Sequence, residues 1–553
     1  MIIGGVAAGA SAAAKARRCD ENARIVVFEK GKDISYATCG LPYYLSGVIA
    51  NRKKLLVTKA SFFEKRFKVT VHTEHEVTAI GREGSGVEYI NHATGKKGWE
   101  TYDRLIIAPG SSPIIPPIPG CNLPFVFTLK TLEDTDRIHH HLHENKPSRA
   151  VIIGAGLIGL ETAENLVHAG LQVSVVEAAP HILPFMDQEM AEMLQAHSAK
   201  EGLTYHLSDP VAAIYEDGKR GLVETKSGKT LEADLVIIAA GIRPNIELAK
   251  NAGLAIGEAG GIVVDEYMRT SDPAIYAAGD CVESINLVTG KSMIFPMGAA
   301  ANKQGRAAGA NAVGGNIKVK GFTGTVIVKL FEQTAAKTGL SEREALAEGY
   351  TPYLSYILAL HHAGYYPGGK DIRLKTICDA DTGRILGAQA IGQEGVDKRI
   401  DIMATAIYAK MNIEDLMHLD LAYAPPYSSA RDPIFVSGAV GQNFYSGQWI
   451  PISPSALHTQ MNNGEEMVLL DVRTEKEVQK TGIIPGALNI PIDELRDRID
   501  ELDQEKKIVL YCAIGLRSYL GYRILKMKGF DNISALSGGI GCWTYPLKPV
   551  PNQ

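Results

Sequence analysis

The stretch AVIIGAGLIGLETAENLVHAGLQVSVVEA, residues 150–178, largely decides the fold of this chain. An apolar strand leads through a glycine-rich turn into a helix, and a second apolar strand follows that ends on an acid. This order is typical of the βαβ unit that binds a dinucleotide. Gly154, Gly156 and Gly159 match the full GxGxxG spacing, and Glu177 lies where a carboxylate can accept hydrogen bonds from a ribose.

A second copy of the pattern runs from residue 2 to residue 30, as IIGGVAAGASAAAKARR and later ARIVVFEK. The positions where its backbone must turn tightly and approach a pyrophosphate are Gly4, Gly5 and Gly9. Glu29 ends the second strand, at the place of the ribose-binding acid. Val6 replaces one glycine of GxGxxG, so this copy alone is the weaker signal. Two copies with correctly placed acids predict two nucleotide-binding domains.

The bulk composition narrows the class of protein. A chain of 553 residues is too long for one hydrophobic core, and 45% hydrophobic with 22% charged residues is typical of a globular protein. The net charge of −5 does not suggest nucleic acid or an anionic membrane as a partner. No signal peptide or membrane-spanning apolar run is recognisable, so we expect a cytoplasmic protein without membrane insertion.

Cysteine and histidine usage argues against metal binding. Seven cysteines are scattered along the chain and none forms a CxxC pair, which argues against a disulfide framework and a zinc site. Four histidines lie between residues 139 and 143, but neighbours on a helix point in different directions. No metal site is therefore expected.

The later part of the chain changes its pattern twice. From about 320 to 440, β-rich runs are followed by a helix around IDIMATAIYAKM, which predicts an α+β domain. Residues 441–454 are rich in Gly, Pro, Ser and aromatics without helical periodicity, which predicts a linker. The remainder alternates strands and helices, including an amphipathic helix near IDELRDRIDEL, and predicts a small α/β domain.

A third motif, TSDPAIYAAGDCVE at 270–283, carries Asp280 in a small-residue turn after a strand. It resembles the second flavin-binding motif of flavoproteins with two dinucleotide-binding domains, in which the acid contacts the ribityl chain. The resemblance implies FAD in the first unit and NAD(P)H in the second. Because Glu177 would repel a 2′-phosphate, NADH is favoured, with NADPH left open. Cys281 is expected to serve packing.

The segment ISYATCGLPYYLSG, residues 34–47, contains the candidate reactive thiol Cys39. Glutathione-reductase-like enzymes carry two cysteines here, separated by four residues, but Tyr44 occupies the second position in this chain. A lone thiol cannot form an internal disulfide, so Cys39 is expected to cycle as a mixed disulfide, a persulfide or a sulfenic acid. A helix N-terminus, the flavin and the nicotinamide are expected nearby and would stabilise its thiolate.

Residues 1–440 resemble the coenzyme A-disulfide reductase and NADH-dependent persulfide reductase branch of the pyridine nucleotide-disulfide oxidoreductases. The resemblance rests on GGVAAG, SYATCGLPYY, GAGLIGLE, AAGDC and YAPPYSSARDP. It implies a homodimer in which two tyrosines of the other subunit assist at the cysteine sulfur. These map onto Tyr365, with Tyr366 as its competitor, and onto Tyr423. Each would hydrogen-bond or protonate the departing thiolate.

The same resemblance implies a binding site for coenzyme A. The residues that match the family's contacts are Ser11, Lys15, Arg18, Ser35, Thr38, Asn302 and Arg431. Lys15 and Arg18 could face the phosphates together, although a solvated basic helix face explains them as well. Thr38 stands where the family usually has Asn, which puts discrimination for coenzyme A in question.

The last domain contains LLDVR at 469–473, the stretch IPGALNIP, and YCAIGLRS at 511–518, and these resemble single-domain rhodaneses. Cys512 follows a strand and opens the turn CAIGLR, whose N–H groups would form an anion-cradling nest with Arg517 beside it. Such a turn would stabilise a thiolate and then a persulfide. Asp471 and Arg473 are expected to brace the domain as an ion pair.

These observations predict an α/β protein with two Rossmann-like nucleotide-binding domains, an α+β dimerisation domain and a C-terminal rhodanese-like α/β domain. The expected boundaries are 1–110 and 246–319 for the two parts of the FAD-binding domain, 111–245 for the NAD(P)H-binding domain, 320–440 for the dimerisation domain, 441–454 for the linker and 455–553 for the rhodanese-like domain.

The expected function is reduction of coenzyme A disulfide, persulfide or polysulfide by NAD(P)H through FAD and Cys39, with Cys512 carrying sulfane sulfur. Fusion to the last domain favours persulfide or polysulfide over a simple disulfide, with coenzyme A as the carrier. Three alternatives stay open: an NADH peroxidase or oxidase that uses a Cys39 sulfenic acid, a sulfurtransferase whose flavin unit resets the carrier, and a redox-sensing binding protein.

Overall fold

The computed structural model describes residues 1–218 and 220–550, and its residues form two compact units. One unit comprises Met1–Ile182 with Ala199–Phe322, and the other comprises Leu183–Ser198 with Thr323–Gln553. Lys219, in the predicted NAD(P)H-binding domain, and the last three residues of the predicted rhodanese-like domain lie outside the described residues.

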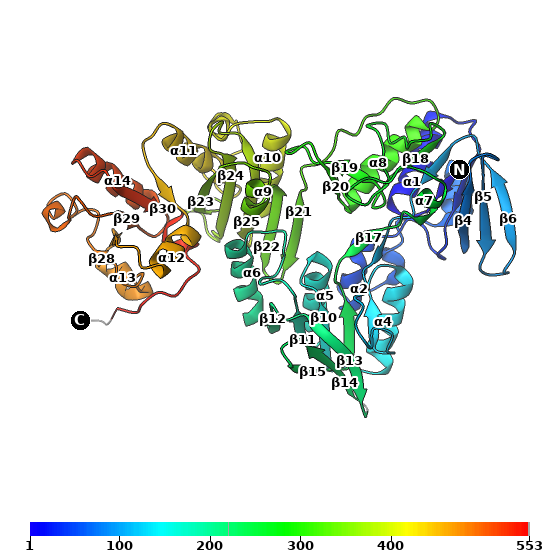
Figure 1. The fold of residues 1–553 in the computed structure, drawn as a ribbon, viewed down its shortest axis with the longest axis horizontal. Helices are drawn as coiled ribbons and strands as arrows, with labels where there is room; N and C mark the ends of the chain where they lie inside the picture. The colour runs from blue at the N-terminus through cyan, green and yellow to red at the C-terminus, as the bar shows by residue number, and fades with distance from the viewer. Residues whose placement is uncertain (219, 551–553) are drawn as a thin grey trace. The chain divides into compact units, whose positions relative to one another are not determined.

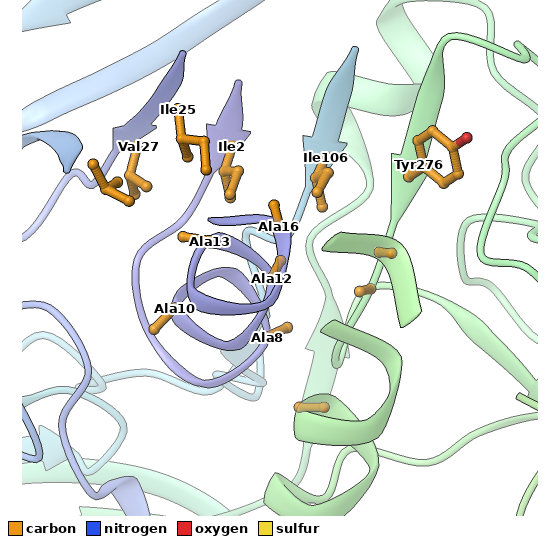
Figure 2. Close-up of a cluster of buried hydrophobic side chains, with 14 of the residues drawn as sticks. Ile2, Ala8, Ala10, Ala12, Ala13, Ala16, Ile25, Val27, Ile106 and Tyr276 are labelled. Carbon is orange, nitrogen blue, oxygen red and sulfur yellow. The ribbon is translucent and has the colours of Figure 1, made fainter. Parts of the chain in front are cut away.

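The N-terminal βαβ unit forms part of a parallel sheet with the order β18-β7-β1-β2-β3. Its strands are β1 (Ile2–Ile3), β2 (Ile25–Phe28), β3 (Val69–His72), β7 (Leu105–Ile107) and β18 (Ile275–Ala277). The alanines of α1 (Ala7–Cys19) pack under Ile2 and Ile106 (Figure 2). Small residues also let α8 (Gly298–Asn311) approach α1, because a Cβ on Gly305 would lie 2.2 Å from the Ala8 carbonyl oxygen.

The second βαβ unit forms a parallel sheet with the order β12-β11-β10-β16-β9. Its strands are β9 (Val126–Thr128), β10 (Arg149–Ile153), β11 (Gln172–Val176), β12 (Leu203–His206) and β16 (Leu235–Ile238), and α5 (Leu157–His168) follows its glycine turn. An antiparallel pair, β8 (Ser111–Pro113) with β17 (Ile242–Pro244), joins the two chain segments that lead into and out of this region.

This unit also contains the antiparallel pair β19 (Glu283–Ile285) with β20 (Ser292–Ile294) and two three-stranded antiparallel sheets. One contains β4 (His75–Gly81), β5 (Gly86–Asn91) and β6 (Lys97–Thr101), and the other contains β13 (Val211–Asp217), β14 (Arg220–Thr225) and β15 (Thr230–Ala233). Smaller elements that bear on the site are α2 (Leu41–Leu45), which follows the 3₁₀ turn Thr38–Gly40, and α4 (Leu132–Glu144).

The other unit begins with an antiparallel sheet ordered β21-β22-β25-β24-β23. Its strands are β21 (Val326–Leu330), β22 (Gln333–Gly339), β23 (Pro352–Leu360), β24 (Asp371–Asp379) and β25 (Ile385–Gly392). The helices α6 (Gln188–Lys200), α9 (Glu342–Ala347), α10 (Val396–Tyr408) and α11 (Pro433–Tyr445) accompany it (Figure 1). The α+β composition predicted for this region is confirmed.

A parallel sheet ordered β26-β30-β29-β27-β28 forms the C-terminal domain. Its strands are β26 (Pro451–Ile452), β27 (Val468–Asp471), β28 (Leu488–Asn489), β29 (Ile508–Tyr511) and β30 (Ile533–Leu536). Its helices are α12 (Pro454–Asn462), α13 (Glu475–Thr481) and α14 (Leu516–Met527), and the 3₁₀ turn η5 spans Gly539–Cys542. The domain contacts the preceding sheet, since the Tyr356 N–H donates to Ser537 Oγ at 2.9 Å and Arg373 Nε donates to the Gly541 carbonyl at 2.9 Å.

The local structure differs from the expectation in two places. The segment 441–454 is not irregular throughout, because α11 continues to Tyr445 and β26 joins the C-terminal sheet. Aromatic burial explains this: Phe444 stacks on Tyr353 with ring centroids 4.1 Å apart, and Trp449 is buried in the C-terminal core. The stretch IDELRDRIDEL forms turns and a short 3₁₀ segment rather than a helix, with Arg498 paired to both Glu494 and Glu501.

Among the residues described, no helix combines the length and the apolar character needed to cross a bilayer.

Candidate active sites

Both glycine turns have the geometry that the fingerprint predicts. Gly4 has φ +94°, and a Cβ on Gly9 would lie only 1.8 Å from the Gly4 carbonyl oxygen. In the second turn Gly154 has φ +108°, and a Cβ on Gly159 would lie 2.1 Å from the Gly154 carbonyl oxygen. Only glycine fits such close approaches between a helix and a strand end. A Cβ on Gly156, by contrast, would meet no heavy atom within 4 Å, so the backbone there is open to a ligand.

The two predicted acids make matching contacts. Glu29 accepts hydrogen bonds from the N–H groups of Gly5 at 2.7 Å and Gly31 at 2.8 Å. Glu177 accepts from Ala155 at 2.7 Å and Ala179 at 2.8 Å. Each carboxylate therefore fixes its own glycine turn. A carboxylate has about four acceptor positions, so ribose hydroxyls can still be accommodated. Both turns thus fit a dinucleotide on the chemistry of their donors and acceptors.

Asp280 lies three residues after the end of β18 and accepts hydrogen bonds in a polar cluster that the sequence did not reveal. Its Oδ2 accepts from Ser111 Oγ at 2.7 Å and from Lys130 Nζ at 3.1 Å, and Lys130 also donates to Ser111 at 2.8 Å. Because these residues are up to 169 positions apart in the chain, no local sequence pattern predicts that they form a cluster. The lysine places a positive charge where the sequence predicted contact with a flavin side chain.

Cys39 is exposed and lies in the 3₁₀ turn that leads into α2. Helix α2 is bonded to α5, the helix after the second glycine turn. Tyr43 Oη donates to Glu161 at 3.2 Å, and Ser46 Oγ donates to Asn165 Oδ1 at 2.5 Å. The turn that contains the candidate thiol is thus held, through the helix that follows it, next to the second nucleotide-binding region.

Glu161 is a candidate site residue that sequence reasoning missed. Burial raises its pKa to about 7, and the neighbouring Glu164 adds to this rise, while the Tyr43 hydrogen bond opposes it. Burial, followed by the charge of Glu161, raises the pKa of Tyr43. The sequence offered one signal for this pair, a carboxylate within the apolar run GLIGLE of the second turn. A carboxyl that titrates near neutrality can exchange a proton with a neighbouring group.

Tyr44 occupies the position of the family's second cysteine and packs against α4. Its ring stacks on His139 with centroids 4.7 Å apart, and His139 in turn stacks on His143 at 4.1 Å. Burial, and then the charge of His143, lowers the pKa of His139. This stack packs α2 against α4, and His139 and His143 contribute to it as packing residues.

Six of the seven residues predicted for coenzyme A lie in the same unit as Cys39, whereas Arg431 lies in the other unit. Ser11 Oγ donates to Asn302 Oδ1 at 2.5 Å, which joins α1 to α8. Ser35 has φ +47°, and its N–H donates to the Gly5 carbonyl at 2.9 Å. Thr38 directly precedes Cys39 in the same turn.

The two basic residues of the predicted coenzyme A set differ in their surroundings. Lys15 is half-buried, whereas Arg18 is exposed and its Nε donates to the Ala14 carbonyl of its own helix at 2.9 Å. The neighbouring Arg17 is buried and donates to five backbone carbonyls. Arg17 is therefore structural, and the choice of Lys15 and Arg18 for a ligand stays a prediction.

The structure brings together the two predicted tyrosines. Tyr365 Oη and Tyr423 Oη share a hydrogen bond of 3.1 Å, and both side chains are exposed. This hydrogen bond raises the pKa of Tyr365. The competitor Tyr366 instead packs edge-on against His362, with centroids 5.4 Å apart. Tyr365 and Tyr423 therefore form a hydrogen-bonded pair, and Tyr366 takes no part in that hydrogen bond.

A buried ion pair anchors both tyrosine loops. Arg399 donates to Asp432 at 2.7 Å and to the carbonyl of His361 at 2.8 Å, while Ser428 donates to Asp432 at 2.5 Å. Although burial alone would raise the pKa of Asp432, the contacts with Arg399 and Ser428 lower it. Arg399 is thus a positioning residue for the pair.

Cys512 is buried at the start of the loop between β29 and α14. The Gly515 N–H donates to its Sγ at 3.1 Å, and the thiol contacts Ser518 Oγ at 3.7 Å. Gly515 has φ +107°, which aims its N–H into the loop. Arg517, predicted beside this loop, makes two hydrogen bonds to Glu477, at 2.6 and 2.7 Å.

Other predicted features of the last domain also have clear positions. Arg473 and Asp471 form a buried ion pair, and Arg473 also donates to the Gly482 carbonyl at 2.7 Å, which is the bracing role predicted. Cys281 is fully buried, and this burial, followed by the charge of Asp280, raises its pKa to about 12. It serves packing, as predicted.

In the unit that comprises Leu183–Ser198 and Thr323–Gln553, a buried acidic cluster has the ligand types of a cation site. Asp187, Glu189 and Glu342 converge there, but Lys375 Nζ lies 2.6 to 2.8 Å from all three. Tyr356 Oη adds a hydrogen bond to Glu189 at 2.7 Å. Burial by itself would lower the pKa of Lys375, yet the surrounding groups raise it. The lysine ammonium therefore supplies the positive charge of this cluster.

Comparison with known proteins agrees with this geometry. The family model "Pyridine nucleotide-disulphide oxidoreductase" matches residues 1–301. The chain belongs to the pyridine nucleotide-disulphide oxidoreductase family. The dimerisation domain of that family matches residues 325–433, and a rhodanese-like domain matches residues 453–545. The fold class and the family resemblance drawn from the sequence are both confirmed.

Three similar proteins bear on function. An "NADH oxidase" of Methanocaldococcus jannaschii is 38% identical over 78% of this chain and 96% of its own length. An "NAD(P)H sulfur oxidoreductase (CoA-dependent)" of Pyrococcus abyssi is 37% identical over 80% of this chain and 97% of its own length. The structure of an NAD-dependent persulfide reductase from A. fulgidus superposes with a TM-score of 0.92 at 42% identity, and covers 98% of this chain and 99% of that one.

Proposed function

We propose that this chain is an FAD-dependent NAD(P)H oxidoreductase that reduces coenzyme A persulfide, polysulfide or disulfide through Cys39. The observation that supports this proposal most directly is that the thiol of Cys39 is exposed in the turn leading into α2, and that α2 is hydrogen-bonded to α5, the helix after the second glycine turn. The similarity to a persulfide reductase over the whole chain supports the same substrate class. The similarity to a CoA-dependent sulfur oxidoreductase supports coenzyme A as the carrier.

The proposed roles of the two glycine turns follow from the hydrogen-bond donors and acceptors that each turn presents. The turn at Gly154–Gly159, with Glu177, holds the pyridine nucleotide, and the turn at Gly4–Gly9, with Glu29 and Asp280, holds FAD. When bound, FAD passes an electron pair from the pyridine nucleotide to sulfur. NADH is favoured because Glu177 opposes a 2′-phosphate, and NADPH stays open.

At the sulfur, the Cys39 thiolate attacks a persulfide or disulfide and the substrate's S–S bond breaks. One sulfur forms a new bond to Cys39, and the other leaves as a thiolate that needs a proton. The Tyr365–Tyr423 pair is proposed to supply hydrogen bonding or that proton, from the other subunit of a homodimer. Both tyrosine side chains are exposed in this chain, so they are accessible for contact with another subunit. Glu161, through Tyr43, is proposed to hold a proton beside Cys39.

Coenzyme A is proposed to bind near Cys39 through Ser11, Lys15, Arg18, Ser35, Thr38 and Asn302. Arg431 belongs to the other unit, and its contact with coenzyme A stays a prediction from the family resemblance. In the last domain, Cys512 is proposed to carry sulfane sulfur, with Arg517 as an accessory residue. A cytoplasmic location stays a prediction from the sequence.

The test follows NADH consumption with coenzyme A disulfide, coenzyme A persulfide, polysulfide and oxygen as separate acceptors. Cys39→Ser should abolish persulfide turnover and sulfide release, and Cys512→Ser should reduce them. Cys19→Ser is the matched control, because Cys19 is also exposed but lies at the end of α1. Persulfide turnover that survives in Cys39→Ser would overturn the proposal.

A second candidate is reduction of oxygen or peroxide through a Cys39 sulfenic acid, which the similarity to an "NADH oxidase" favours. The oxygen arm of the same experiment decides between them. Faster NADH consumption with oxygen than with coenzyme A persulfide would select this candidate.

A further inference from the structure

The loop that holds Cys512 carries almost no charge of its own. Its six residues, CAIGLR at 512–517, include one ionisable side chain besides the thiol, that of Arg517. The loop is fixed from below by backbone hydrogen bonds, from the Ile540 N–H to the Cys512 carbonyl at 2.9 Å and from the Gly541 N–H to the Ala513 carbonyl at 3.0 Å. Apart from the partial positive charge of the loop N–H groups and of the N-terminus of α14, any charge that a sulfur donor meets must therefore come from Arg517 or from neighbouring segments.

The charge of Arg517 is already compensated. Both of its terminal nitrogens bond to the Glu477 carboxylate, and Glu477 also accepts from the Thr474 N–H at 3.0 Å. The hydrogen bond from Arg517 is the main cause that lowers the pKa of Glu477, so the pair stays ionised at neutral pH. A bidentate guanidinium–carboxylate pair leaves little net attraction for a further anion.

The other cations near this loop are also engaged. Arg473 is buried against Asp471, and Arg373 on β24 donates to the Gly541 carbonyl beneath the loop. These contacts direct both guanidinium groups toward protein oxygens. Of these side-chain cations, none is left uncompensated, so the N–H groups of the loop and of the N-terminus of α14 have no free guanidinium beside them to help gather a small dianion.

The exposed rim of the loop is apolar instead. Ile514 is 50% exposed and Leu516 is 61% exposed, and Leu520, one helical turn beyond Leu516, is 45% exposed. Cys512 between them is buried. Neighbouring apolar side chains that remain exposed around a buried reactive atom mark a surface that binds an apolar group.

Resting on the proposed role of Cys512 as a sulfur carrier, we propose that its donor is a low-molecular-weight thiol persulfide with an uncharged, largely apolar arm beside the sulfur. Small inorganic anions such as thiosulfate are disfavoured. The arm packs on Ile514 and Leu516, and the loop N–H groups receive the sulfur. Apolar contact supplies the attraction, at about 25 cal/mol per Å² of buried surface.

The transfer balances without any further reactant. The Cys512 thiolate attacks the outer sulfur of R–S–SH, a bond forms from Cys512 Sγ to that sulfur, and the donor's S–S bond breaks. The products are Cys512–S–SH and the thiolate R–S⁻, which carries away the electron pair of the broken bond. The proton of the donor stays on the transferred sulfur.

The test measures loading of Cys512 with one sulfur atom by mass spectrometry of the full-length protein, without pyridine nucleotide. Pantetheine persulfide is the uncharged-arm probe, cysteine persulfide the charged-arm probe, and thiosulfate the inorganic probe. We expect pantetheine persulfide to load Cys512 at least about tenfold faster than either of the others, a preference of about 1.4 kcal/mol.

Two variants change the proposed determinants. Leu516→Lys replaces an apolar rim residue by a cation and should reduce the preference for pantetheine persulfide over thiosulfate about tenfold. Glu477→Gln releases the charge of Arg517 and should accelerate thiosulfate. Met527→Lys is the matched control, because Met527 is 73% exposed at the far end of the same helix, and it should leave the preference unchanged.

Failure of this inference differs from failure of the proposed function. If wild type loads faster with thiosulfate, or if Leu516→Lys and Glu477→Gln leave the preference unchanged, the inferred donor class is wrong while the carrier role stands. If none of the three donors loads Cys512, the carrier role fails and this inference fails with it. NADH-dependent turnover through Cys39 is measured separately and is unaffected by either result.

Discussion

Replacing Gly156 by alanine should weaken binding of the pyridine nucleotide without weakening the fold. Gly156 has φ −79° and ψ −171°, values that alanine adopts readily, and a Cβ there would meet no heavy atom within 4 Å. Val6 occupies the corresponding place in the first βαβ unit with φ −93° and ψ −133°, so the two turns present this position to a pyrophosphate differently. The folded protein therefore has room for the methyl group.

The bound nucleotide does not have that room. A pyrophosphate must approach the backbone of the turn closely to accept hydrogen bonds from it. A methyl group in that space should remove at least one hydrogen bond to a charged group, which costs about 1.5 to 3 kcal/mol. The dissociation constant for NADH should thus rise about 10- to 100-fold.

The assay is a fluorescence titration of the protein with NADH, with the thermal midpoint measured in parallel. Gly159→Ala is the contrasting variant, because its Cβ would lie 2.1 Å from the Gly154 carbonyl oxygen and must destabilise the region itself. An unchanged NADH affinity in a stably folded Gly156→Ala protein would refute the assignment of this turn. A loss of stability as large as that of Gly159→Ala would refute the claim of open space.

Two further predictions concern buried charge. The Glu161 carboxyl keeps its proton to about pH 7 when folded, against an ordinary pKa of 4.5, so the folded state binds the extra proton between these values. The contribution of this proton to the free energy of unfolding is complete below pH 4.5 and is lost as the pH rises through 7, by at most about 3 kcal/mol. Glu161→Gln should therefore remove this decrease from the pH dependence of the denaturation midpoint. Lys375→Met should destabilise the second unit by about 3 to 5 kcal/mol, because it leaves three converging carboxylates without their cation. Thermal denaturation measures this loss, and adding Glu189→Gln should recover part of it; a Lys375→Met protein as stable as wild type would contradict this account.

The glycine turns could be predicted from the sequence because their geometry is local. The tight turns at Gly4 and Gly154 follow from spacing within one βαβ unit, and so do the acids that end each second strand. The same holds for the Cys512 loop, whose strand, glycine and helix are consecutive. Where a feature depends on a few neighbouring residues, a single sequence contains the information needed.

The missed features depend on residues that are distant in the chain. Tyr43 and Glu161 are 118 positions apart, and Lys130 and Asp280 are 150 positions apart. The composition of the chain and the spacing of its motifs do not predict such pairs, because these contacts arise only in the folded protein. The order within segment 441–454 has the same origin, since Phe444 stacks on Tyr353 and Trp449 packs in the C-terminal core only once the chain is folded.

The structured segment 441–454 bears on the route of the sulfur transfer that we propose for Cys512. A freely swinging domain would need an irregular connection and few contacts with its neighbour. Here α11 extends into the segment, Trp449 is buried, and Tyr356 and Arg373 bond to the segment that supports the Cys512 loop. Moving the domain would break these buried contacts together. A diffusible carrier needs none of them broken, so the fixed position of the loop favours a small persulfide over a moving domain as the vehicle of sulfur.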